Sequence, residues 1–264
     1  ALAATMSGIS FTNGYQLAKP YIYFPLHLLF MGEFWNLSET PPWLAPYWSL
    51  GYEVWYYVIF GTAYYATGAK RIVMLASLLV LVGFKLWLLF PVWLSGVALY
   101  RWSLSRSLPE GWARGGWWLS IAALCVYKLV DADLYLRALG VTVWPFPTLK
   151  LGSADRYLAD YVVCGMVLLN FACARSLGFP LLRKIGGPIR MLAGCTFTLY
   201  LVHDLVLMAW KNFYPHDPTS VLDITLVLLA VMLATYLASF VTERRKDEFK
   251  RGFYHASELL GRAR

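Results

Sequence analysis

Long apolar stretches separated by short polar segments are the feature that most constrains this chain. A bilayer crossing needs about 20 apolar residues, or somewhat fewer where the membrane thins locally. Eight stretches approach or reach that length, at residues 20–33, 46–66, 72–88, 89–102, 114–130, 156–174, 189–211 and 219–242. A soluble core could not hide them, because 59% of the residues are hydrophobic and 14% are charged, against about 25% charged in soluble domains. We therefore predict an all-α fold, a polytopic transmembrane helical bundle.

The eight predicted spans are unequal in length. The first, at 20–33, is short, and the run from 72 to 102 is too long for one helix and barely long enough for two. We expect the break in that run at Pro91, since proline disfavours a continuing helix. The prediction is thus about eight spans, two of them short enough to be re-entrant.

Basic residues predict the orientation of the bundle. Short cytoplasmic loops collect Lys and Arg, and a cytoplasmic C-terminus places 17 of the 23 basic residues on that side. This divides the chain into a transmembrane domain at 1–242 and a basic cytoplasmic tail at 243–264, which anionic lipids would attract. Loops 32–46 and 131–155 then face outward, the second as a lid or wall of a cleft or as a helix lying on the membrane.

Isolated polar residues in this scheme are expected to be structural. We predict that Lys85 extends to the outer interface, that Asp223 caps a helix start, and that His27 is either a packing residue or an interfacial one. The four cysteines lie in apolar runs, without CxxC spacing or a histidine at ligand spacing. They predict small buried side chains, with no metal site and no disulfide. The lipid bilayer is the expected partner, and no nucleic acid is expected.

One candidate site lies in the span at 46–66. Ser49, Glu53 and Tyr57 follow one another at intervals of four, so a helix places them on one face. Ionisable groups at membrane depth are costly and usually face the bundle interior or a cavity. We expect this face to point inward, either as part of a site or because a hydrogen-bonded Glu53 locks two helices together.

A second candidate lies in the span at 189–211, where Tyr200, His203 and Asp204 interrupt an apolar run. A histidine exchanges protons near neutral pH, and a neighbouring carboxylate tunes it; the alternative is a packing histidine. At 1.5 Å per residue, Glu53 lies about 10 Å below the outer surface and His203 about 21 Å from the inner one, in a core of roughly 30 Å. The similar depths favour one polar cavity shared by Glu53 and His203.

Residues 27–60 resemble the acyltransferase-3 family of bacterial membrane O-acyltransferases. The specific part is PYWSLGYEVWYY, which is similar to that family's Trp-Ser-Leu-x-x-Glu-x-x-Tyr/Phe motif. A second segment, LAGCTFTLYLVHDLVL, resembles the family's late Ser-Tyr-x-x-Tyr-Leu-x-His segment. The matching residues are Trp48, Ser49, Leu50, Glu53 and Tyr56 in the first, and Thr196, Phe197, Tyr200, Leu201 and His203 in the second.

The resemblance has one departure. The family's presumed catalytic histidine on the first span, with its preceding basic residue, and the arginine pair ahead of the third or fourth span have no counterpart here. Nothing before His27 can serve. We therefore expect the match to begin partway through the domain, so that the transmembrane domain is incomplete at its N-terminus.

The resemblance implies a membrane-bound O-acyltransferase in a bacterial inner membrane. It would transfer an acyl group, most often acetyl, from acyl-CoA (acetyl-CoA) to a hydroxyl of a carbohydrate or glycolipid, with no bound cofactor. Glu53 and His203 are the expected catalytic residues, and Trp48, Ser49, Tyr57, Tyr200 and Asp204 the expected substrate contacts. Three alternatives stay open: a transporter or flippase for a lipid-linked sugar, a non-catalytic partner subunit, and another membrane acyltransferase superfamily.

Overall fold

The computed structural model describes residues 20–41, 44–179, 182, 184–214 and 216–242, with the single residues 245, 248 and 251. The described residues are 79% helical and contain no strand, which confirms the predicted all-α fold. The chain divides into two compact units. The α8 unit comprises Lys19–Thr40 and Trp48–Leu181, and the α11 unit includes Pro41–Tyr47 and Leu182–Arg264.

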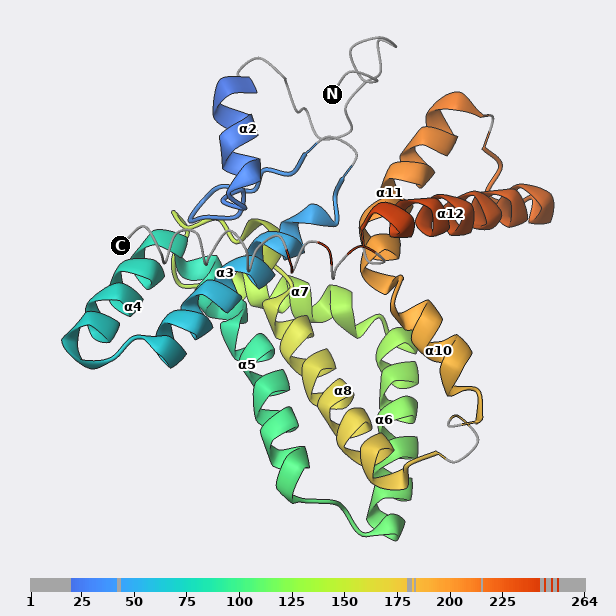
Figure 1. The fold of residues 1–264 in the computed structure, drawn as a ribbon, viewed down its shortest axis with the longest axis horizontal. Helices are drawn as coiled ribbons and strands as arrows, with labels where there is room; N and C mark the ends of the chain where they lie inside the picture. Colours follow the sequence, from blue (N-terminus) through green and yellow to red (C-terminus); the bar gives the residue numbers. More distant parts are fainter. Residues whose placement is uncertain are drawn as a thin grey trace. The chain divides into compact units, whose positions relative to one another are not determined.

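The α8 unit is built around one central helix. Its elements are α2 (Pro20–Leu28), α3 (Tyr47–Tyr65), α4 (Gly68–Val82), α5 (Phe84–Ser105), α6 (Glu110–Leu129), α7 (Ala132–Val143), the 3₁₀ helix η1 (Gly152–Ala154) and α8 (Tyr157–Leu177). Helix α8 packs against α5, α6 and α7, and Figure 1 shows it between α5 and α6. It ends at Gly178, whose φ of 68° is the left-handed conformation that commonly ends a helix.

The break between α4 and α5 falls at Gly83, which corrects the predicted break at Pro91. The two helices bend by 115°, and Gly83 has φ 84° and ψ 177°, a conformation that is essentially restricted to glycine. Trp35 occupies the bend: its indole donates to the carbonyl of Val80 at 3.0 Å and its backbone N–H to that of Val82 at 3.4 Å. Pro91 lies inside α5, which continues past it.

The α11 unit contains a helical hairpin. Its elements are α10 (Gly186–Ala193), α11 (Thr196–Phe213) and α12 (Val221–Val241), with a bend of 53° between α10 and α11. Helix α12 buries one stripe at intervals of four residues, and α11 and α12 pack on each other (Figure 1). The stripe is formed by Asp223, Val227, Val231, Thr235 and Ser239. The remaining faces of α12 expose leucine and valine side chains, as expected for a surface that lipid would cover.

The eight predicted spans are not confirmed. Among the described residues, two helices are long and apolar enough to cross a membrane, α8 and α12. Four spans result if the pairs α4–α5 and α10–α11 each count as one. The short first span becomes the nine-residue helix α2, and the long loop predicted at 131–155 contains α7 and η1. The predicted tail at 243–264 lies outside the described residues except for positions 245, 248 and 251.

Candidate functional site

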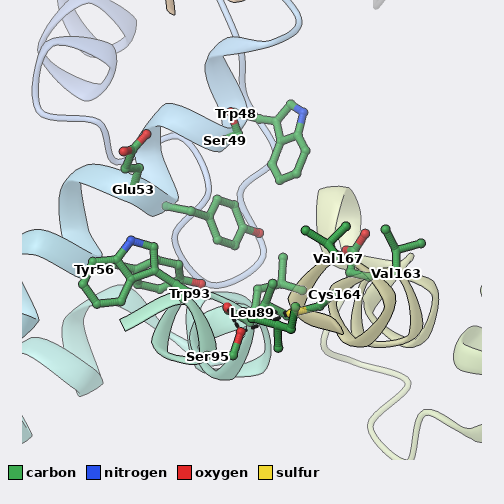
Figure 2. Close-up of a pocket in the computed structure, with 15 residues that line it drawn as sticks. Trp48, Ser49, Glu53, Tyr56, Leu89, Trp93, Ser95, Val163, Cys164 and Val167 are labelled. Atoms are coloured by element: carbon green, nitrogen blue, oxygen red, sulfur yellow. Dashed lines mark hydrogen bonds between the residues drawn. The ribbon is translucent and has the colours of Figure 1, made fainter. Parts of the chain in front are cut away.

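A cavity of about 530 Å³ lies in the α8 unit, between three helices. Helices α3, α5 and α8 contribute five lining residues each (Figure 2). They are Trp48, Ser49, Tyr52, Glu53 and Tyr56 from α3, Leu89, Val92, Trp93, Ser95 and Gly96 from α5, and Asp160, Val163, Cys164, Val167 and Leu168 from α8. Mostly apolar walls with a few polar groups are typical of sites for small organic ligands.

Four of the five residues of the first motif line this cavity: Trp48, Ser49, Glu53 and Tyr56. The helix period explains the set, because the motif's spacing puts these side chains near one face of α3. The predicted inward face is correct only in part. Ser49 and Glu53 line the cavity, but Glu53 lies at its exposed rim and Tyr57 is 58% exposed. The Tyr57 hydroxyl donates to Glu53 Oε1 at 3.3 Å.

Asp160 is a second carboxylate of the cavity, and the sequence reading did not single it out. It lies in the first turn of α8 and lines the cavity with Glu53. In the sequence it looks like an ordinary acidic residue at a helix start, where aspartate favours the helix dipole. Two carboxylates, the Ser49 and Ser95 hydroxyls and the Trp48 and Trp93 rings thus share one cavity, a set able to bind hydroxyl groups and to pack against a sugar ring.

Three tyrosine and serine hydroxyls hold the cavity walls together. Tyr56 donates to the carbonyl of Leu86 at 2.8 Å, which joins α3 to α5. Tyr161 donates to the carbonyl of Leu88, and Ser95 Oγ lies 3.1 Å from Cys164 Sγ, which join α8 to α5. The cavity is therefore bounded by helices that are hydrogen-bonded to one another.

A buried ion pair supports the cavity from the side of Tyr52. Lys85 Nζ lies 3.0 Å from Glu33 Oε2, and the two side chains are 0% and 3% exposed. This corrects the prediction that Lys85 extends to the outer interface. Lys85 also donates to Ser38 Oγ at 3.0 Å and to the carbonyl of Leu37, so its three N–H groups are satisfied.

Glu33 joins this ion pair to the cavity wall. Its carboxylate accepts from Ser153 Oγ at 3.0 Å and from the Tyr52 hydroxyl at 3.4 Å. Burial raises the pKa of Glu33, while the charge and hydrogen bond of Lys85 lower it again. The network ties the loop after α2 and the 3₁₀ helix η1 to α3 and α5, and thereby orients Tyr52 at the cavity.

The second predicted group lies on α11, in the α11 unit. The Tyr200 hydroxyl donates to the carbonyl of Pro46 at 3.2 Å, and Asp204 Oδ2 accepts from the backbone N–H of Ala45 at 3.0 Å. His203 Nδ1 donates to the carbonyl of Leu199 at 3.1 Å. In a neutral imidazole ring, Nε2 is then the nitrogen that can accept a proton. The cavity's lining residues all belong to the α8 unit, so the cavity shared by Glu53 and His203 stays a prediction.

A histidine–aspartate pair at the turn between α11 and α12 was not predicted from the sequence. His216 Nδ1 lies 2.5 Å from Asp223 Oδ2, and the Trp210 indole donates to Asp223 Oδ1 at 2.9 Å. The prediction that Asp223 caps the start of α12 is wrong. The capping side chain is that of Ser220, which accepts a hydrogen bond from the Asp223 backbone N–H. In the same turn, hydrogen bonds from Thr219 lower the pKa of Asp217.

Metal-ligating residues do not gather in the described part of the chain: no group of three or more His, Cys, Asp or Glu side chains could hold an ion there. The four cysteines are free thiols. The prediction that all of them are buried is wrong, since Cys173 is buried, Cys164 and Cys195 are half-buried, and Cys125 is exposed.

The chain matches no protein-family model, no curated protein and no solved structure. The resemblance to the acyltransferase-3 family therefore depends on the sequence motifs alone and stays a prediction.

Proposed function

We propose that this chain belongs to a membrane-bound O-acyltransferase that moves an acyl group, most often acetyl, from acyl-CoA to a hydroxyl of a cell-surface carbohydrate or glycolipid. The observation that supports this most directly is the cavity lined by Trp48, Ser49, Glu53 and Tyr56, the residues of the motif that resembles the acyltransferase-3 family. Aromatic rings beside carboxylates and hydroxyls suit a sugar acceptor, which offers both ring faces and hydroxyl groups.

The chemistry needs a base and a way to stabilise developing charge. A general base takes the proton of the acceptor hydroxyl, whose oxygen attacks the thioester carbonyl carbon. Hydrogen-bond donors stabilise the resulting oxyanion. The carbon–sulfur bond then breaks, and the CoA thiolate leaves and takes up a proton.

In this proposal Glu53 and His203 are the catalytic residues, and no bound cofactor is required. Trp48, Ser49 and Tyr57 contact or orient the substrates from α3, as do Tyr200 and Asp204 from α11. The contact of His203 Nδ1 with the Leu199 carbonyl requires a proton on Nδ1, and a neutral ring would then offer Nε2 as the base.

The membrane setting is part of the same proposal. Helices α8 and α12 are apolar and long enough to cross a bilayer. We extend this to about eight spans in a bacterial inner membrane, with the C-terminus in the cytoplasm, as the distribution of basic residues favours.

Transfer of labelled acetyl from acetyl-CoA tests the proposal. Membranes that contain the full-length protein should form a base-labile ester on cell-envelope glycan, and Glu53→Gln should lower the rate by about 10²–10⁴-fold if Glu53 acts in proton transfer. Glu110→Gln is the matched control, because that carboxylate is exposed and pairs with Arg114 on the surface. Absence of ester on every carbohydrate acceptor tried would refute the proposed function, whereas full activity of Glu53→Gln would remove only that residue.

A further inference from the structure

A polar hollow lies at the other end of the α5–α8 helix pair, where both helices end. Its volume is about 340 Å³. Two arginines, Arg106 and Arg175, line it together with four serines and Leu104. The serines are Ser103, Ser105, Ser107 and Ser176. No carboxylate is among the lining residues, so the charge of the hollow is positive.

Both guanidinium groups lack a protein partner in the part of the chain that the structure describes. Neither Arg106 nor Arg175 has a side-chain hydrogen bond or ion pair there, although Arg114, Arg137 and Arg156 each pair with a carboxylate. An arginine presents donors in a planar fork that matches the geometry of phosphate. Two such forks at one hollow therefore leave several charge-bearing donors for an anion.

The wall of the hollow is pre-organised. The Leu108 backbone N–H donates to Ser176 Oγ at 3.0 Å, which fixes the α5–α6 connection to the end of α8. Ser176 Oγ in turn donates to the carbonyl of Ala172 at 3.0 Å, and Ser103 Oγ to that of Tyr100 at 2.7 Å. The two segments that carry the arginines are thus held together without using either guanidinium.

The hollow is also aligned with the motif-lined cavity. Helices α5 and α8 contribute Gly96 and Leu168 to the cavity, and Ser103 and Arg175 to the hollow. Seven residues separate the two sites on each helix, which is about 10 Å at the rise of an α-helix. An extended molecule with a charged end in the hollow would therefore place its other end in the cavity.

We propose that Arg106 and Arg175 form a phosphate-binding site. The choice of ligand rests on the proposed function: it is the phosphorylated nucleotide end of the acyl-CoA donor. The pantetheine arm would then run along α5 and α8 toward the cavity. An anionic lipid headgroup offers the same phosphate chemistry, and the experiment separates the two sources. Basic residues at helix ends also favour the helix dipole, but that role predicts no ligand.

Adenosine 3′,5′-bisphosphate is the probe, since it carries phosphates but neither a thiol nor an acyl group. Its binding to the full chain in a neutral detergent is measured by titration calorimetry at two salt concentrations. We expect salt-sensitive binding that Arg106→Gln or Arg175→Gln weakens by about tenfold to a hundredfold. Arg101→Gln is the matched control, because this exposed arginine lies one turn earlier on α5 and does not line the hollow. Arg106→Lys retains the charge but loses the fork, and should weaken binding less than Arg106→Gln.

The second arm uses nanodiscs of phosphatidylcholine with or without phosphatidylglycerol. Loss of bisphosphate binding in the two variants but not in Arg101→Gln supports the nucleotide ligand. If only enrichment of phosphatidylglycerol around the protein depends on Arg106 and Arg175, the site binds lipid phosphate, and the donor assignment is overturned. If neither probe responds selectively, the phosphate site is refuted. Binding is read without turnover, so failed acyl transfer with intact binding would refute the proposed function alone.

Discussion

Removing the ammonium group of Lys85 should destabilise the α8 unit strongly. In Lys85→Met the apolar stem is retained, but Glu33 keeps a buried negative charge without its counter-ion, and the carbonyl of Leu37 and the hydroxyl of Ser38 lose a donor. Loss of one partner of a buried ion pair costs about 3–5 kcal/mol. The carboxylate retains Ser153 and Tyr52 as donors, so we expect the lower half of that range.

Lys128→Met is the matched control for this substitution. Lys128 is 72% exposed and its ammonium lies 4.0 Å from Asp133. An exposed pair of this kind contributes about 0–1 kcal/mol, so the control should unfold within about 0.5 kcal/mol of the unmodified chain. The free energy of unfolding is measured in detergent by denaturant titration, followed by circular dichroism or tryptophan fluorescence. Glu33→Leu combined with Lys85→Met should recover part of the loss, because no charge is then buried alone.

The pH dependence of Lys85→Met supplies an independent check. Burial raises the pKa of Glu33, and Lys85 opposes this, so the variant raises it further. A carboxyl whose folded-state pKa exceeds its unfolded value binds the proton more tightly when folded, and folded stability then falls as pH rises through that range. The variant should therefore be less destabilised at pH 5 than at pH 8. A loss below about 1 kcal/mol at pH 8, or a loss that grows as the pH falls, would refute this account of the network.

Three further predictions follow from single contacts. Gly83→Ala should lower the free energy of unfolding by about 2–4 kcal/mol, because the new Cβ would lie 2.9 Å from a neighbouring indole and φ is 84°. Gly68→Ala is the control, with φ 58° and open space around the new Cβ, and should lower it by about 1 kcal/mol. Both values are measured by denaturant titration. His216→Ala should remove the bond to Asp223 and speed amide exchange in the α11–α12 turn, with no change in the α8 unit. Tyr56→Phe should cost about 0.5–1.5 kcal/mol through the lost bond to a backbone carbonyl of α5, measured in the same titration.

Helix positions were predictable from the sequence because apolar length is a local property. The stretch predicted at 46–66 became α3 (Tyr47–Tyr65), that at 156–174 became α8 (Tyr157–Leu177), and that at 219–242 became α12 (Val221–Val241). Each bound depends on the residues of its own segment, such as the glycine after α8 or the serine before α12.

The break between α4 and α5 was less predictable, since two candidates lie close together. Proline removes one donor from a helix, but α5 continues through Pro91. Gly83 breaks the run for two reasons. Its backbone conformation is essentially restricted to glycine, and Trp35, nearly fifty positions earlier, donates hydrogen bonds to two carbonyls at the end of α4. The glycine marks a possible break within the run from 72 to 102, but the contact with Trp35, which lies outside that run, distinguishes Gly83 from Pro91.

The same reasoning accounts for Lys85 and for the part of the candidate site that was missed. A lone lysine in an apolar run is expected to reach water, unless another segment brings a carboxylate. Glu33 does so here from the loop after α2. Asp160 was missed because the residues that line the cavity with it come from α3 and α5 as well as from α8. The pair of His216 with Asp223 was missed because a turn of the chain brings these two side chains together.

Polar side chains beside the apolar helices are thus of two kinds among the described residues, and their hydrogen bonds separate the two kinds. Lys85 and Glu33 satisfy each other and their neighbours fully, so they leave nothing for a ligand and stabilise the frame. Glu53 has one long bond, to a tyrosine, at the rim of a cavity, and Arg106 and Arg175 have no side-chain partner among the described residues. A ligand gains binding free energy where hydrogen-bonding groups at a hollow lack protein partners. By this criterion Glu53 and the two arginines are the residues of the α8 unit at which we expect a ligand to bind.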